Sequence, residues 1–180
     1  MVVFLKRSIQ LLGMGIKTGT FKWDIKEISN ALKIKESDVR LYFTDGRRVS
    51  FILERRLAYE ILNGKLAPNE GEGYDLLDST GGKWEVRSIS KGGIYFCPSY
   101  MVGSGRSFEL RGFLSKLKEI KGYIISDIES FPEVRFWIIP VEQVKKWWDS
   151  KQLGTTTKIS REKALQLIEE ISNSGQRGLG

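Results

Sequence analysis

The stretch from Gly73 to Lys91 constrains the fold of this chain more than any other part of the sequence. It predicts two short strands, at residues 74–78 and 83–89, joined by a tight turn. The turn contains two consecutive glycines, which adopt positive φ angles without strain. We therefore expect an antiparallel hairpin around which the other elements are arranged.

Two acidic side chains and one basic side chain of this hairpin are expected to converge at one end of a small sheet. Glu85 and Arg87 point to the same face, because side chains alternate between the two faces of a strand. Asp75 lies near the start of the partner strand, across the hairpin from them. Two fixed carboxylates are what a hard cation such as Mg²⁺ requires of a protein, since water and phosphate can fill its other coordination positions. The alternative is a surface hairpin with solvated charges.

The chain has no histidine and a single cysteine, Cys97. Ser-His-Asp and Cys-His nucleophilic sites, nucleases with a histidine base and structural zinc sites are therefore excluded. An intramolecular disulfide is excluded as well, and we expect a cytoplasmic protein without a signal peptide or a membrane span. Catalysis by this chain would depend on carboxylates, Lys, Arg and Tyr, or on a metal ion held by oxygen atoms.

The charge balance restricts the class of partner. Lys and Arg number 29 against 22 Asp and Glu, which gives a formal net charge of +7 and a pI of about 9.5. Polyanions are the natural partners of such a surface, and nucleic acid is the first among them. The alternative is a basic protein without any such partner, and charge alone does not distinguish the two.

Residues 1–49 are expected to form a small helical segment. A short helix at 2–13 would end in a glycine-rich stretch that reaches Gly19. A second helix is expected from an Asp24 cap to Leu32, and after a tight turn a third helix begins at a Ser37 cap.

This helix, turn and helix, followed by Asp-Gly-Arg-Arg, resembles the helix-turn-helix of excisionase-like and winged-helix DNA-binding proteins. The resemblance implies that the second helix faces DNA bases and that the arginines after it contact phosphate. The alternative is an ordinary helical hairpin that packs on the core. The implied base-facing residues are Ser37, Asp38, Arg40 and Thr44, and the implied phosphate contacts are Arg47 and Arg48.

A helix at 51–63 is expected next, capped by Ser50 and closed by Gly64. After the hairpin, the glycine-rich loop 99–105 could let backbone N–H groups approach a phosphate, with Arg106 as a phosphate-binding candidate. The helix at 108–120 is expected to bury Phe113, Leu114, Leu117 and Ile120 and to leave Lys116 outside. The other expected elements are strands at 94–97, 123–128 and 134–139 and helices at 141–150 and 161–172.

Asp75, nine intervening residues and then Glu85-Val86-Arg87 resemble the motif of the PD-(D/E)XK nucleases, which include most type II restriction endonucleases. In that family the Asp and the Glu bind the metal, and a Lys usually stands where this chain has Arg87. The expected element order approaches the family's αβββαβ core, except that 66–72 is a poor candidate for the strand that precedes the Asp strand. The resemblance implies an α/β (α+β) fold with a nuclease core at 50–150, between the helical segment at 1–49 and a C-terminal helix and tail at 151–180.

The same resemblance implies the site. Asp75 and Glu85 would hold one or two Mg²⁺ ions, and Arg87 would stabilise the transition state, with Lys83 and Lys91 as reserves for a lysine function. A Glu on the first core helix can join the metal shell in this family, and Glu54 fits that position best, followed by Glu60. Lys91 is also a candidate DNA contact, together with Arg106.

We therefore expect a Mg²⁺-dependent endonuclease of double-stranded DNA, specifically a type II restriction enzyme. A palindromic recognition site would require a homodimer with twofold symmetry. Three alternatives stay open: a non-catalytic helix-turn-helix DNA-binding regulator, a structure-specific nuclease of the junction-resolvase kind, and a structural subunit of a defence complex.

Overall fold

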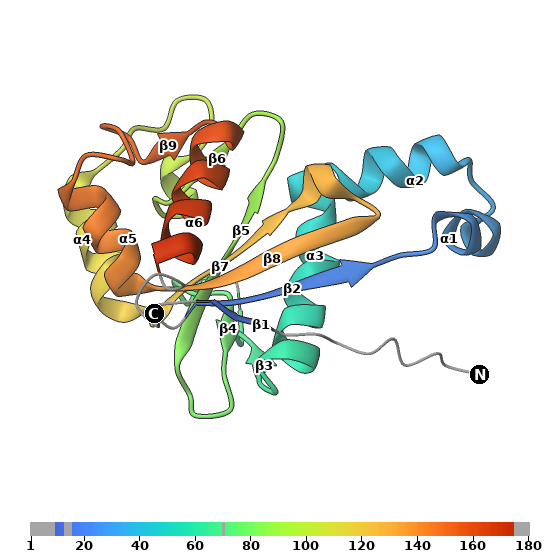
Figure 1. Cartoon of the computed structure of the whole chain (residues 1–180), viewed down its shortest axis with the longest axis horizontal. Helices are drawn as coiled ribbons and strands as arrows, with labels where there is room; N and C mark the ends of the chain where they lie inside the picture. The colour runs from blue at the N-terminus through green and yellow to red at the C-terminus, as the bar shows by residue number, and fades with distance from the viewer. Residues whose placement is uncertain (1–9, 13–15, 70, 175–180) are drawn as a thin grey trace.

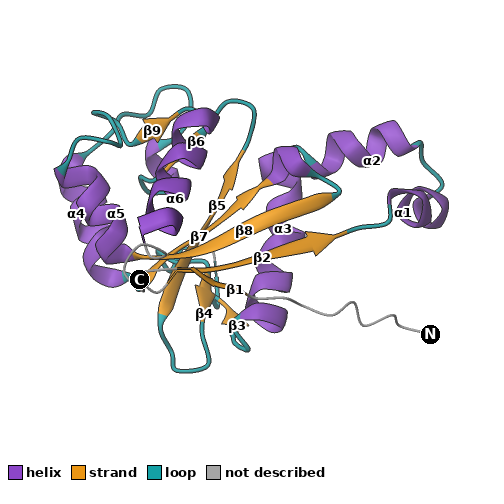
Figure 2. Cartoon of the chain, viewed as in Figure 1, coloured by secondary structure: helices purple, strands orange, loops and turns teal. Residues whose placement is uncertain are grey.

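The computed structural model of the chain describes residues 10–12, 16–69 and 71–174. Within these residues the fold is a mixed α/β (α+β) architecture, in which helices cover both faces of a seven-stranded sheet (Figures 1 and 2). Strands β5 and β7 are parallel neighbours, and the other neighbouring pairs are antiparallel. In spatial order the strands are β1 (Gln10–Leu12), β2 (Ile16–Lys22), β8 (Glu133–Pro140), β7 (Gly122–Asp127), β5 (Lys83–Ile89), β4 (Leu76–Leu77) and β3 (Lys65–Leu66).

Each face of the sheet has its own apolar core. On one face, Tyr123 and Ile139 pack with side chains of three helices, α4 (Leu110–Glu119), α5 (Val141–Asp149) and α6 (Arg161–Ser174). On the other face, Ile124 and Phe136 pack with side chains of α3 (Gly46–Arg56). Strand β7 is buried along its whole length, which confirms the prediction of a strand covered on both faces.

The first helices follow the predicted order, with a correction to the third. Asp24 caps α1 (Ile25–Leu32) by accepting a hydrogen bond from the Glu27 N–H at 2.9 Å. Helix α2 (Glu36–Phe43) follows, and these two helices lie away from α4, α5 and α6 (Figure 1). Helix α3 begins at Gly46 and not at 51, because Asp45 accepts hydrogen bonds from the N–H groups of the first turn. It continues as a π-helical turn, Leu57–Ile61.

The prediction that the glycine-rich stretch before Asp24 extends to Gly19 is wrong, and Gly13 and Gly15 lie outside the described residues. The predicted helix at 2–13 lies mostly outside the described residues, and its described part, Gln10–Leu12, is strand β1. Strand β2 then runs through Gly19 and pairs with β8 from Lys17 to Lys22. Glycine is needed there for packing, because a Cβ on Gly19 would lie 2.5 Å from the Phe136 Cζ atom.

The hairpin forms as predicted at β5, but its neighbours differ from the prediction. Strand β3 precedes β4 and pairs with it, so a strand does lie before Asp75. The strand predicted at 94–97 is limited to β6 (Ile94–Tyr95) and pairs with β9 (Lys158–Ile159) in a separate small sheet. The connection from β5 to β7 passes through β6 and α4, which is the long crossover that parallel neighbours require.

We predict that Gly19→Ala lowers the free energy of unfolding by about 1–3 kcal/mol, the range for overpacking a filled core. The added methyl group would push the Phe136 ring away from β2. Denaturant unfolding measures the change. Gly92→Ala is the matched control, because the nearest neighbour atom, the Ser90 Oγ, would lie 3.8 Å from the new Cβ. Equal effects of the two substitutions would contradict the position of β2 in the sheet.

Candidate active site

The start of β4 holds Asp75 directly against β5. The Asp75 N–H donates to the Trp84 carbonyl at 3.0 Å, and its Oδ2 accepts from the Val86 N–H at 2.7 Å. Val86 follows Glu85 in the chain, so the backbone itself fixes the two carboxylates beside each other. The structure therefore brings together the Asp and the Glu that the hairpin pattern singled out.

Glu85 is buried between two cations. Its side chain is 3% exposed, and it forms ion pairs with the Arg87 guanidinium through Oε1 and with the Lys116 ammonium through Oε2. Arg87 also lies near the first carboxylate, with its Nη1 atom 3.9 Å from the Asp75 Oδ2. Oε2 of Glu85 nevertheless has no partner with hydrogen-bond geometry among the described residues. Both oxygens of this buried carboxylate are thus in contact with a cation.

Arg87 is anchored mainly by the backbone. It donates from Nε to the Tyr95 carbonyl at 3.2 Å, from Nη2 to the Cys97 carbonyl at 3.0 Å and from Nη1 to the Val86 carbonyl at 2.9 Å. Burial by itself would lower the pKa of Arg87, but the charges of Glu85 and Asp75 outweigh it and raise that pKa above its ordinary value. Arg87 therefore stays charged and links β5 to the segment that follows β6.

Lys116 is the site residue that sequence reasoning missed. It was expected outside its helix, yet its side chain is 8% exposed, and the Nζ contacts Glu85 and donates to the Gly73 carbonyl. Leu114, which was expected inside, is 38% exposed. The available signal was spacing, because Lys116 lies three residues after Phe113 and next to Leu117, within the apolar stripe of α4.

Glu54 adds a third carboxylate from α3. Burial, followed by the charge of Asp75, raises the pKa of Glu54 to about 7, although Arg55 acts in the opposite direction. Burial and the charge of Glu85 raise the pKa of Asp75 to about 6, against the effect of Arg87. Acidic groups that resist ionisation together form a place where a cation would be stabilised.

The donor set fits a hard divalent ion better than a transition metal. Among the described residues, no group of three or more His, Cys, Asp or Glu is arranged to hold a metal ion entirely by protein ligands. Asp75 and Glu85 supply oxygen only, and Mg²⁺ binds through one or two carboxylates while keeping several waters.

The other predicted catalytic residues lie elsewhere. Lys83 is exposed, with its Nζ 4.9 Å from the centre of the Tyr74 ring. Lys91 is exposed, and its backbone N–H donates to the Glu129 carboxylate. Glu60 forms an ion pair with Arg56 at 3.0 Å on the π-helical turn. The structure does not bring either reserve lysine into contact with Glu85, and Lys116 occupies that place.

The predicted DNA-binding residues divide into two groups. Ser37 and Arg40 lie exposed on α2, and the Thr44 hydroxyl donates to the Arg40 carbonyl at the end of that helix. Arg48 pairs with Asp45 at 3.4 Å. The second group is Arg47 and Arg106, which line one pocket together.

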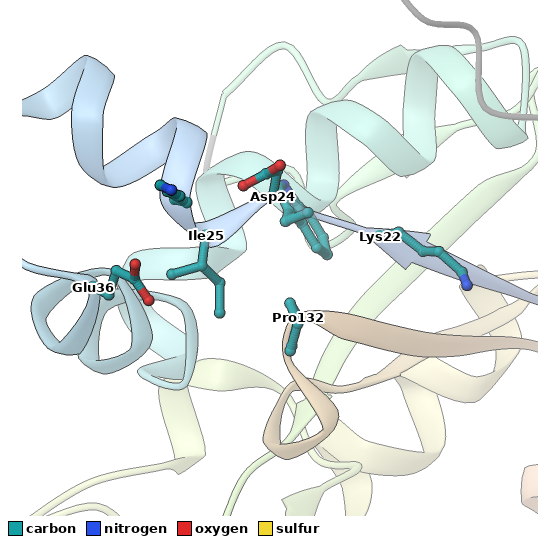
Figure 3. Close-up of a pocket in the computed structure, with 7 residues that line it drawn as sticks. Lys22, Asp24, Ile25, Glu36 and Pro132 are labelled. Atoms are coloured by element: carbon teal, nitrogen blue, oxygen red, sulfur yellow. The ribbon is translucent and has the colours of Figure 1, made fainter.

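A different pocket lies where β2 meets α1 and α2, with Lys22, Asp24 and Glu36 around its mouth (Figure 3). Two of its polar side chains already have structural partners. Lys22 pairs with Glu133 at 2.9 Å, and Asp24 caps α1. This pocket therefore offers weaker grounds for chemistry than the carboxylate cluster.

The chain matches no protein-family model, no curated protein and no solved structure. Within the described part of the chain, no helix has the length and apolar character needed to cross a membrane. The interpretation of the site therefore depends on its own geometry and electrostatics.

We predict that Glu54→Gln stabilises the protein in a pH-dependent way. The folded state holds the Glu54 proton to about pH 7, whereas the unfolded chain releases it near 4.5, so wild-type stability falls as the pH rises through this interval. The variant should gain about 1–3 kcal/mol near pH 8 and nothing near pH 4. Denaturant unfolding at the two pH values measures this, with the exposed Glu169→Gln as control. A gain of the same size at both pH values would contradict the assignment.

Proposed function

We propose that this protein is a Mg²⁺-dependent deoxyribonuclease of the PD-(D/E)XK type that hydrolyses phosphodiester bonds in duplex DNA. The observation that carries the proposal is the pair Asp75 and Glu85, held side by side by the Val86 N–H on a strand that also carries Arg87. Glu54 and Lys116 complete a site of three carboxylates and two cations.

The order of elements supports the proposal. Helix α3 is followed by β3, β4 and β5, then by α4 and β7, and these four strands are neighbours in the order β3, β4, β5, β7. The first pairs are antiparallel and the last is parallel. This order agrees with the αβββαβ core that the sequence resemblance implies, with Asp75 just before the second strand and Glu85 in the third.

Each residue has a distinct part in the proposed reaction. Asp75 and Glu85 would hold Mg²⁺, which when bound lowers the pKa of a water and offsets negative charge on the phosphoryl group. The Glu54 carboxyl group lies near enough for the charge of Asp75 to raise its pKa. Arg87 keeps its proton, so it cannot serve as a base and would stabilise the charge of the transition state. Lys116 places a compact ammonium against Glu85, where it would orient the attacking water.

The charge and the absence of histidine fit this substrate. A net charge of +7 favours a polyanion, and a carboxylate site needs no histidine base. Helices α1 and α2 extend from the sheet and carry Arg40 and Ser37 on exposed positions, which suits a role in choosing a DNA site. We extend the proposal to a type II restriction endonuclease that acts as a homodimer on a palindromic sequence.

We predict that the protein cuts duplex DNA with Mg²⁺ and binds it without cutting when Ca²⁺ replaces Mg²⁺. Asp75→Asn and Glu85→Gln should abolish cleavage while DNA binding persists, because each removes a metal ligand but keeps the shape of the side chain. Gel assays on mixed plasmid and genomic DNA, and on a four-way junction, measure this, and Asp149→Asn on the exposed end of α5 is the control. Full cleavage by Asp75→Asn would show that Asp75 is not part of the active site. Binding without cleavage by the wild type would favour a non-catalytic DNA-binding regulator.

We further predict that Lys116→Met slows cleavage by about two orders of magnitude, the effect of losing one preorganised charge at a reacting centre. Lys118→Met is the matched control, because Lys118 lies on the same helix and is exposed. Arg87→Ala should slow cleavage to a similar extent, whereas Arg87→Lys should keep partial activity. Single-turnover rates at saturating Mg²⁺ measure all four variants. If Lys116→Met and Lys118→Met are equally active, Lys116 has only a structural part.

A further inference from the structure

A polar pocket of about 540 Å³ lies between the start of α3 and the glycine-rich loop that precedes α4. The sequence offered these two regions separately as phosphate candidates, and the structure brings them to one place. The pocket is lined by Arg47, Ser99, Val102, Gly103, Ser104 and Arg106.

The charges in this pocket are positive and uncompensated. The Arg47 guanidinium makes no hydrogen bond or ion pair with any described residue, and no carboxylate is among the described residues of the lining. The nearest acidic residue in the chain, Asp45, is engaged with Arg48 and with the N–H groups of α3. The start of this helix is therefore already capped, and the attraction for an anion comes from the two arginines.

Arg106 is held in place for such a contact. Its Nη1 atom donates to the Ser99 carbonyl at 3.1 Å and to the Val102 carbonyl at 3.2 Å. These bonds use one edge of the guanidinium and close the loop, while Nε and Nη2 keep their hydrogens for a ligand. A planar, fixed fork of donors matches the oxygens of a phosphate.

The pocket has a fixed relation to the carboxylate cluster, because α3 carries residues of both. Arg47 and Glu54 are seven residues apart, which places them about 10.5 Å apart along the axis and within about 20° around it. A DNA strand rises about 3.4 Å per phosphate along the duplex axis, so one strand that passes both places would put phosphates a few nucleotides apart at them.

We infer that this pocket binds a backbone phosphate of the DNA strand that is cut, within a few nucleotides of the scissile phosphate. The identity of the ligand as DNA rests on the proposed function. The pairing of Arg47 and Arg106 on one phosphate rests on the pocket alone.

The experiment is a double-mutant cycle on binding, measured with a fluorescent duplex oligonucleotide in Ca²⁺ over a range of salt concentrations. Arg47→Met and Arg106→Met should each weaken binding about tenfold, the effect of losing a charged hydrogen bond. Each should lower the log–log salt slope by about 0.9, and the double variant should lower it by the same amount, since one phosphate is lost in every case. Arg48→Met is the matched control and should change the affinity by about twofold or less.

Arg47→Met should fold like the wild type, because the Arg47 side chain has no partner among the described residues whose loss could disturb the loop. Its effect on binding therefore does not come from misfolding. Arg106→Lys accompanies Arg106→Met, since it keeps the charge and loses the fork. Equal weakening by Arg47→Met and Arg48→Met would overturn the pocket in favour of a diffuse basic surface. Additive losses of salt slope would show two separate phosphates and would also overturn it.

Three further results separate the possible outcomes. Saturable binding of inorganic phosphate that Arg47→Met abolishes, with DNA affinity unchanged, would make the pocket a site for free phosphate and overturn the DNA assignment. A wild-type protein that gives the predicted cycle but never cuts DNA would refute the nuclease and support the phosphate pocket. Cleavage that depends on Asp75 with no effect of Arg47→Met on affinity would refute the pocket alone.

Discussion

The burial of Glu85 is the constraint on which the rest of this structure depends. A carboxylate with 3% of its side chain exposed requires cations, and they come from two elements, Arg87 on β5 and Lys116 on α4. Arg87 is bonded in turn to the segment after β6, and Lys116 to Gly73, just before the Asp75 strand. One charged network therefore fixes β4, β5, α4 and the segment after β6 relative to one another.

Such a network is a poor way to gain stability. Removing one partner of a buried ion pair costs about 3–5 kcal/mol, yet apolar side chains of similar volume often stabilise a core as well or better. The raised pKa values of Glu54 and Asp75 point the same way, because ionising these groups opposes folding near neutral pH. A cluster that costs stability in this way is more easily explained by binding or catalysis than by folding.

The sequence predicted the hairpin and the approach of Asp75 to Glu85, because alternation along a strand and a two-glycine turn are local rules. It failed where tertiary contacts decided. The local sequence predicts an interruption at Gly19. It does not show that the Phe136 ring occupies the space where a Cβ on residue 19 would lie. Strand β3 was missed because two residues carry no periodicity. The charge of Lys116 predicts a position on the exposed face of α4, although its spacing places it on the apolar face. Only the fold shows that Glu85 lies opposite Lys116.

Two cations contact Glu85, and together they offer a reason why this chain has Arg87 where the motif it resembles usually has Lys. Arg87 uses its fork to bind three backbone carbonyls as well as Glu85, which a lysine ammonium could not reach from the same position with the same geometry. The compact charge that the motif usually places on the strand comes here from α4. Under the proposed function, the arginine sets the structure of the site and the lysine supplies a compact donor beside the carboxylate. The fixing of neighbouring segments and the proposed catalytic charge are thus served by different elements.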